Sequence, residues 1–289
     1  MKPFPLPVRV VGPGSHVEEE EELQYLAMPR GMAVFEMPRI PPRTDAAHMA
    51  AARELLAGFL DRMEAWDPAD GGNAPRLDLG DVATGTLEIA NQMLGEGEVA
   101  IRVDGARGYR IQESVFAGVW RVCELDGDGR VAKDWVEASP IPSVVTDAAH
   151  AGSDAVLPVV ALPDGAMNSP ALLAEIQEQI RAWRPGQEAH VINLTLFPMS
   201  PEDHQVMERA VPVGPVAIMS RGFGNCRVTS TGAQHVWRVQ YFNNMNTLIL
   251  NTIEIVDLPE VAAAAVEDLA DSRERFAELI EWMGESAEA

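Results

Sequence analysis

Val119-Trp120-Arg121-Val122 and Val236-Trp237-Arg238-Val239 are the same four residues, 117 positions apart. The same shift, without a gap, places Glu98-Val99-Ala100-Ile101 on Pro215-Val216-Ala217-Ile218. Residues 52–145 and 169–262 then share 21 identities in 94 pairs, which is roughly four times the number expected for unrelated sequences. A constant shift over this length indicates a tandem duplication of one domain. Residues kept in both copies are candidates for the scaffold, and residues found in one copy are candidates for a site.

Each copy has the same predicted order of elements, α-β-α-β-β-β-β. Helices are predicted at 46–65 and 84–94, and again at 170–183 and 201–210. Strands are predicted at 76–79, 97–103, 108–113, 118–125 and 131–138, and then at 191–197, 214–220, 225–231, 234–242 and 247–256. Short links between the last four strands of each copy favour hairpins, so we expect an α+β fold with mainly antiparallel sheets and helices on one face.

The segments outside the two copies differ from them in composition. Residues 1–45 are rich in proline and carry an acidic run at 18–22, which predicts an extended N-terminal arm. The expected units are therefore repeat unit one at 46–145 and repeat unit two at 169–262, joined by a linker at 146–168. Residues 263–289 complete a C-terminal helix that begins near Pro259, because apolar residues there recur at helical spacing.

The composition restricts the class of partner and the compartment. The chain has 289 residues, a formal net charge of −22 and two cysteines. This charge repels nucleic acid and anionic membranes, and it attracts a basic protein or peptide. Two separate cysteines form no disulfide framework, and the sequence shows neither a signal peptide nor a membrane span, so we expect a cytoplasmic protein.

Few residues fit a known catalytic or metal-binding pattern. None of the six histidines stands at metal-ligand spacing, and no phosphate-binding loop or nucleophile elbow is found, so we expect no metal and no cofactor. Cys226 is a lone thiol without a histidine nearby in sequence. The matched residues Arg110 with Glu137, and Arg227 with Glu254, predict one buried ion pair in each copy.

The candidate binding surface is found in copy two alone. Its strand start and its last hairpin turn carry amide and hydroxyl side chains, which both donate and accept hydrogen bonds and suit recognition of a protein or peptide. The predicted partner-binding residues are Asn225, Cys226, Arg227, Asn243, Asn244 and Asn246. The alternative is that Asn243 to Asn246 merely form a turn, as Asp126 to Gly129 do in copy one.

Three stretches of copy two carry a family resemblance: 222–231 (GFGNCRVTST), 236–242 (VWRVQYF) and 248–254 (LILNTIE). Together with Gly12-Pro13-Gly14-Ser15 and Leu26-Ala27-Met28-Pro29, they resemble the HupH/HyaF/HoxQ hydrogenase expression/formation family, strongest over 214–260, where its C-terminal conserved region lies. The resemblance implies an accessory protein for maturation of uptake [NiFe]-hydrogenase. It implies action on the small, iron–sulfur subunit before twin-arginine export, beside a thioredoxin-like chaperone.

Two classes of function remain open from the sequence. The first is a non-enzymatic chaperone that binds the small-subunit precursor, since an acidic surface suits a basic signal segment. The second is an enzyme that uses Cys226 as a redox or transfer residue on the client's cluster. A scaffold that bridges several accessory proteins is a third possibility.

Overall fold

The computed structural model describes residues 45–67, 73–221 and 225–288, so the predicted arm and the motif residues Gly222, Phe223 and Gly224 lie outside it. The first half contains α1 (Ala46–Glu64), β1 (Arg76–Asp78), α2 (Thr84–Leu94), β2 (Val99–Val103), β3 (Gly108–Glu113), β4 (Val119–Leu125) and β5 (Val131–Ala138). The second half contains α4 (Ser169–Ala182), β6 (His190–Asn193), the 3-10 helix η2 (Leu194–Leu196), α5 (Pro201–Ala210), β7 (Val213–Ser220), β8 (Asn225–Thr231), β9 (Val236–Phe242) and β10 (Leu248–Ile255). The predicted α-β-α-β-β-β-β order is therefore present in both halves.

Further helices join and follow the two halves. The helix α3 (Ser143–His150) comes after β5, and the 3-10 helix η3 (Glu260–Ala262) with α6 (Val266–Glu288) comes after β10. The sequence placed the end of unit one and the start of the linker within α3. It also merged η3 and α6 into one helix. Among the described helices, none combines the length and the apolar character that a membrane span requires.

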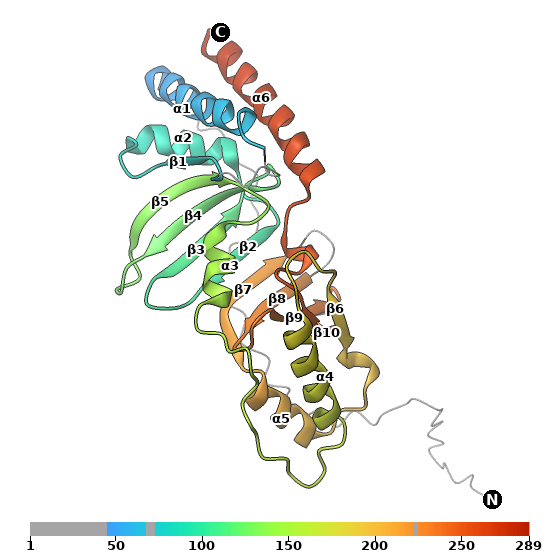
Figure 1. Cartoon of the computed structure of the whole chain (residues 1–289). Coiled ribbons are helices and arrows are strands. Elements are labelled where there is room, and N and C mark those ends of the chain that lie inside the picture. Colours follow the sequence, from blue (N-terminus) through green and yellow to red (C-terminus); the bar gives the residue numbers. More distant parts are fainter. Residues whose placement is uncertain (1–44, 68–72, 222–224, 289) are drawn as a thin grey trace, which may run out of the picture. The chain divides into compact units, whose positions relative to one another are not determined.

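The ten strands of the described residues form one antiparallel sheet, not one sheet per half (Figure 1). Their order is β1-β5-β4-β3-β2-β7-β8-β9-β10-β6, so the second half repeats the order of the first in reverse. The halves meet where β2 pairs with β7, and Ile101 lies opposite Ile218, its counterpart at the shift of 117. Backbone hydrogen bonds across this junction continue the sheet from one half into the other.

The face of the sheet that bears Trp120 and Trp237, which we call the tryptophan face, holds an apolar core shared by both halves. Successive side chains of a strand point to opposite faces, so β2 and β7 place Ile101 and Ile218 on this side. The helix α3 covers part of it with Val145. Helices therefore lie on both faces of the sheet, and the expectation of one covered face was wrong because α3 was read as linker.

The opposite face has a separate core in each half, and Figure 1 shows the helices that build them. In the first half, Phe59 of α1 and Phe276 of α6 pack over Val136 of β5. In the second half, Leu172 of α4 packs with Ile253 of β10. Burial of these side chains stabilises each half by roughly 1.5–3 kcal/mol per large residue.

The two tryptophans at the shared tetrapeptide are core residues, as predicted. Trp120 and Trp237 are each 1% exposed. Their ring nitrogens donate to the backbone oxygens of Ser139 at 2.8 Å and Asp257 at 3.1 Å. The same ring environment is thus built twice, whereas Trp66 and Trp183 are only half-buried.

The predicted ion pairs were wrong, and the pleat of the sheet explains why. Arg110 shares its face with Cys123 and, through the next pairing, with Asp134. Glu137 stands three residues beyond Asp134, so its side chain points to the opposite face. It accepts instead from the Trp135 ring nitrogen at 3.1 Å.

The same parity separates the second pair. Arg227 pairs with Gln240, and Gln240 pairs with Asn251, so these side chains share one face. Glu254 lies three residues beyond Asn251, so its side chain points to the opposite face. Its carboxylate accepts from the Thr252 hydroxyl at 3.1 Å.

Candidate functional site

The predicted partner-binding residues of the second half lie at one end of β8 and β9. Asn225 pairs with Phe242, and the turn at 243–246 follows directly, so the structure brings the segments together. Arg227 stacks over the Phe242 ring with its guanidinium carbon 5.5 Å from the ring centroid. Asn225 and Arg227 share one face, while Cys226 points to the tryptophan face. The six residues therefore do not form one continuous side-chain surface.

The turn between β9 and β10 has a structural explanation that covers part of the prediction. The Asn243 side-chain oxygen accepts from the backbone nitrogens of Met245 and Thr247, both at 2.9 Å. Asn246 adopts a positive φ of 58°, which asparagine tolerates better than most residues. The side chains of Asn244 and Met245 are exposed and take no part in these contacts.

The matching turn of the first half has the same hydrogen bonds. There the Asp126 carboxylate accepts from the backbone nitrogens of Asp128 and Arg130, also at 2.9 Å. Gly129, the counterpart of Asn246, has a φ of 76°. Asn243 and Asn246 therefore contribute to the geometry of the turn.

Cys226 lies inside the core. It is 3% exposed, and burial raises the pKa of its thiol to about 11. A thiol with that pKa is protonated near neutral pH, whereas the thiolate is the reactive form. The environment of Cys226 is that of a packed core residue.

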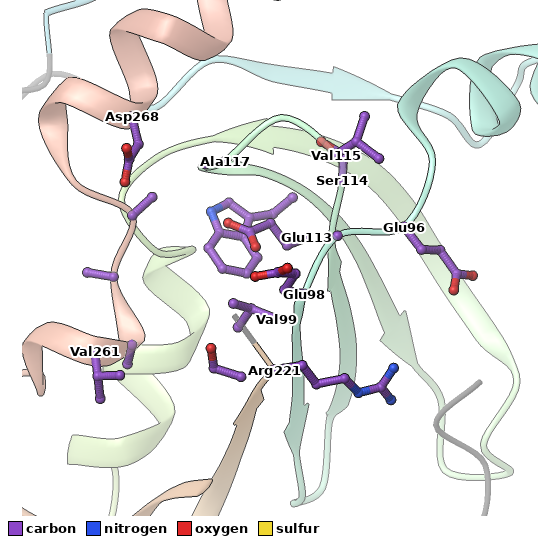
Figure 2. Close-up of a pocket in the computed structure, with 16 residues that line it drawn as sticks. Glu96, Glu98, Val99, Glu113, Ser114, Val115, Ala117, Arg221, Val261 and Asp268 are labelled. Atoms are coloured by element: carbon purple, nitrogen blue, oxygen red, sulfur yellow. The ribbon is translucent and has the colours of Figure 1, made fainter. Parts of the chain in front are cut away.

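A pocket of about 530 Å³ opens where the two halves join (Figure 2). The segment before β2, the end of β3, the end of β7, η3 and the start of α6 line it. Four acidic residues and one basic residue line it: Glu96, Glu98, Glu113, Asp268 and Arg221. Figure 2 shows Glu98 and Glu113 toward the middle of the pocket and Asp268 on the α6 side. The lining is therefore acidic, and it suits a cationic group.

Glu113 is the buried acid of this pocket. Glu113 is 8% exposed, and its Oε1 accepts from the Gly118 backbone nitrogen at 3.2 Å. Burial raises the pKa of Glu113 to about 7, the backbone hydrogen bond from Gly118 opposes that rise, and the charges of Glu98 and Asp268 add to it. A carboxyl with a strongly raised pKa in a pocket is a candidate functional group, because it gains most from an incoming cation.

Sequence reasoning missed Glu113, although the repeat offered a signal for it. The counterpart of Glu113 at the shift of 117 is Ser230, so the acid is present in one half only. Ser230 is buried and accepts from the Val216 backbone nitrogen at 3.0 Å, which is a structural role. Comparison of the two halves in both directions therefore marks Glu113 as an unmatched residue of the first half.

Comparison with known proteins identifies the family. The family model described as "HupH hydrogenase expression protein, C-terminal conserved region" matches residues 49–159 and 166–283. The chain is 45% identical over 285 residues to "Hydrogenase expression/formation protein HoxQ" of Cupriavidus necator, which covers 98% of this chain and 99% of that protein.

Two further relatives match over nearly their whole length. HupH of Rhodobacter capsulatus, also named a hydrogenase expression/formation protein, is 40% identical over 282 residues, covering 96% of this chain and 98% of its own. "Hydrogenase-1 operon protein HyaF" of Escherichia coli is 30% identical over 283 residues, covering 96% and 97%. This chain therefore belongs to the HupH/HyaF/HoxQ family of hydrogenase expression/formation proteins.

Proposed function

We propose that this protein is an accessory protein of hydrogenase maturation that binds the small, iron–sulfur subunit precursor before its export. The observation that carries the proposal is the acidic pocket at the junction of the halves. A twin-arginine signal segment presents adjacent guanidinium groups, and carboxylates bind these through paired, charge-assisted hydrogen bonds. Binding before export places the protein in the cytoplasm, where a thioredoxin-like chaperone is proposed to act beside it.

The test is the affinity of the full chain for the precursor as the salt concentration rises. We expect binding to weaken steadily, since a pocket lined by four acidic residues attracts a basic segment through screened charge. The matched control is the same precursor without its signal segment, which should bind at least tenfold more weakly at low salt. A flat salt profile, or equal affinity for both precursors, contradicts the proposal.

A second contact is proposed on the second half, at the predicted partner-binding residues. The exposed side chains of the β9–β10 turn support it: Asn244 is exposed and Met245 is 84% exposed. Replacement of residues 243–246 by the Asp-Gly-Asp-Gly of the first half should preserve the fold, because both turns use the same hydrogen bonds. Loss of hydrogenase maturation in the folded variant is the expected result, and full maturation removes the proposed contact.

The enzyme alternative rests on Cys226, and the environment of this thiol weighs against it. A buried residue with a pKa raised to about 11 lacks the thiolate that redox exchange or group transfer requires. The variant Cys226→Ser keeps the size of the side chain. The accessory role predicts that it matures hydrogenase as the wild type does, whereas an enzyme that uses this thiol would lose all activity.

We further propose that residues 46–145 and 169–262 are two copies of one ancestral domain joined by 146–168. The reversed strand order and the pairing of Ile101 with Ile218 support it. In that arrangement the sheet junction lies on a local two-fold axis, and the pocket lies beside it.

A further inference from the structure

Among the described residues, three metal-ligand side chains meet at a place that the sequence did not predict. They are His150 at the end of α3, His235 in the turn before β9, and Asp257 just after β10. The Asp257 Oδ1 lies 3.3 Å from His150 Nε2 and 3.5 Å from His235 Nδ1. All three ligand atoms lie within 4.8 Å of one another.

Both histidine nitrogens lack a hydrogen-bond partner. His150 Nε2 and His235 Nδ1 are shielded from solvent, and Asp257 lies at ion-pair distance from both. Buried polar atoms are satisfied in the great majority of native structures, so two unsatisfied atoms that face one carboxylate indicate a missing ligand. A cation placed between them would satisfy both nitrogens and the carboxylate together.

The surrounding structure holds these side chains in place. The Trp183 ring stacks on His235 with centroids 3.5 Å apart and an interplanar angle of 9°. The Val256 backbone nitrogen donates to the His235 oxygen at 2.8 Å, which fixes the turn beside Asp257. The linker is tied to the same turn, because Asp154 exchanges two backbone hydrogen bonds of 2.9 Å with Gly232 and Gln234.

The backbone at His235 is strained, and the first half has no such strain. His235 has a φ of 59°, a region that a residue with a side chain seldom adopts. Its counterpart is Gly118, with a φ of 76°, where a Cβ atom would lie 2.2 Å from Leu269 Cδ2. The counterpart of Asp257 is Pro140. The first half therefore lacks the counterparts of His235 and Asp257, and in the second half a histidine is held where glycine would fit without strain.

The spacing of the ligand atoms suits a transition-metal ion. Metal–nitrogen and metal–oxygen bonds of about 2.0–2.2 Å in a tetrahedron give ligand–ligand edges of about 3.3–3.6 Å. The two measured contacts to Asp257 are 3.3 and 3.5 Å. Imidazole nitrogen is a ligand for zinc, cobalt, nickel and iron, whereas calcium and magnesium prefer a shell of oxygens.

We propose that His150, His235 and Asp257 bind one divalent first-row transition-metal ion through two imidazoles and one carboxylate. The Asp257 side chain is 57% exposed, so the fourth coordination position faces solvent. Water or a donor group of a bound partner can occupy it, as in zinc sites with three protein ligands. The ion would also link α3 to the open end of the β9–β10 hairpin, where His235 precedes β9 and Asp257 follows β10.

The test is a calorimetric titration of Zn²⁺ into the full chain. The protein carries no histidine tag and is treated with a chelator beforehand. We expect one ion per chain. His150→Gln, His235→Gly and Asp257→Asn should each lower the affinity at least tenfold, since each removes a ligand. His235→Gly also replaces the strained residue by the one that its φ favours, so it should fold. Co²⁺ in the wild type should give the intense visible absorption of a four-coordinate ion, which Asp257→Asn loses.

His190→Gln is the matched control, because His190 Nε2 faces only one carboxylate, that of Glu175 at 2.8 Å. It should bind Zn²⁺ as the wild type does. The proposal is overturned if the wild type binds no Zn²⁺, or if the three ligand variants bind it with unchanged affinity. An equal loss in His190→Gln would assign the binding to scattered surface histidines, and this too overturns the proposal.

Discussion

The two halves of the sheet share a framework and differ at the positions where the two binding sites are proposed. Trp120 and Trp237 donate to equivalent backbone regions, and the turns before β5 and β10 have the same hydrogen bonds. By contrast, the first half has Glu113 where the second has Ser230, and the second has His235 where the first has Gly118. The shared positions therefore carry packing, and these unmatched positions carry the ionisable groups of the two proposed sites.

The largest expected effect tests the shared framework. Trp120→Ala and Trp237→Ala should each lower the free energy of unfolding by about 3–5 kcal/mol, because both rings are buried and both ring nitrogens are hydrogen-bonded. Denaturant unfolding of the two variants measures this loss. Trp282→Ala is the control, since Trp282 is 42% exposed and should cost less than about 1 kcal/mol. A large loss in one half alone would show that the tryptophans are not equivalent.

The next effect concerns Asp203, a buried acid of the second half whose matched position in the first half is not acidic. Asp203 is 0% exposed, and its Oδ1 accepts from the Ser169 hydroxyl at 2.8 Å and from three backbone nitrogens. Burial alone would raise the pKa of Asp203, but these hydrogen bonds and one from Ser200 hold it well below its usual range. Asp203→Asn should therefore lower the free energy of unfolding by about 2–3 kcal/mol at neutral pH.

The pH dependence follows from the direction of that shift. A depressed folded pKa gives stability that is complete above the unfolded value of about 4 and is lost as the pH falls below it. The difference between wild type and Asp203→Asn should accordingly shrink in acid. The counterpart in the first half is Thr86, whose hydroxyl lies 3.0 Å from His48 Nδ1. Thr86→Val should cost only about 1 kcal/mol, and an equal cost at both positions would contradict the assignment of the charge to Asp203.

A smaller effect with the opposite pH dependence is expected for Glu113. Its folded pKa of about 7 lies above the ordinary value of 4.5, so the folded state binds the proton more tightly than the unfolded chain. The free energy of unfolding should fall by no more than about 3 kcal/mol as the pH rises between these two values, and it should level off above pH 7. Glu113→Gln should remove that fall, because an amide does not ionise. The variant should still fold, because the amide oxygen can accept from the Gly118 backbone nitrogen. Unfolding measured at pH 5 and pH 8 tests this.

Glu96→Gln, on the exposed rim of the same pocket, is the control for the loss of one negative charge. It should keep the pH dependence of the wild type. An unchanged pH dependence in Glu113→Gln would mean that the carboxyl of Glu113 is solvated and does not perturb the fold.

Much of the fold follows from local sequence patterns. Helix and strand order depends on periodicity, and the start of α5 depends on Ser200 and Asp203, which form the capping box found in the structure. The pairing of β2 with β7 was not predictable in this way, because it joins strands far apart in sequence. The short helix α3 was missed because its eight residues are fewer than the window of about 11–18 residues over which helical periodicity is read.

The sites were less predictable than the fold. The repeat could have revealed Glu113, since comparison with Ser230 marks it as unique to one half. His150, His235 and Asp257 do not lie at the short sequence spacings typical of metal-ligand motifs, so only the folded chain brings them together. The predicted ion pairs failed because matched positions say nothing about which face of a strand a side chain occupies.

The central claim is that the acidic pocket receives the basic segment of the precursor, and a matched pair of charge variants tests it most directly. Glu98→Gln with Asp268→Asn removes two exposed acids of the pocket, and Glu178→Gln with Glu188→Gln removes two exposed acids of the second half. At low salt, calorimetry should show at least tenfold weaker precursor binding, about 1.4 kcal/mol, for the pocket variant. The control should bind within about twofold of the wild type. Equal losses in both variants, or no loss in either, would contradict the claim.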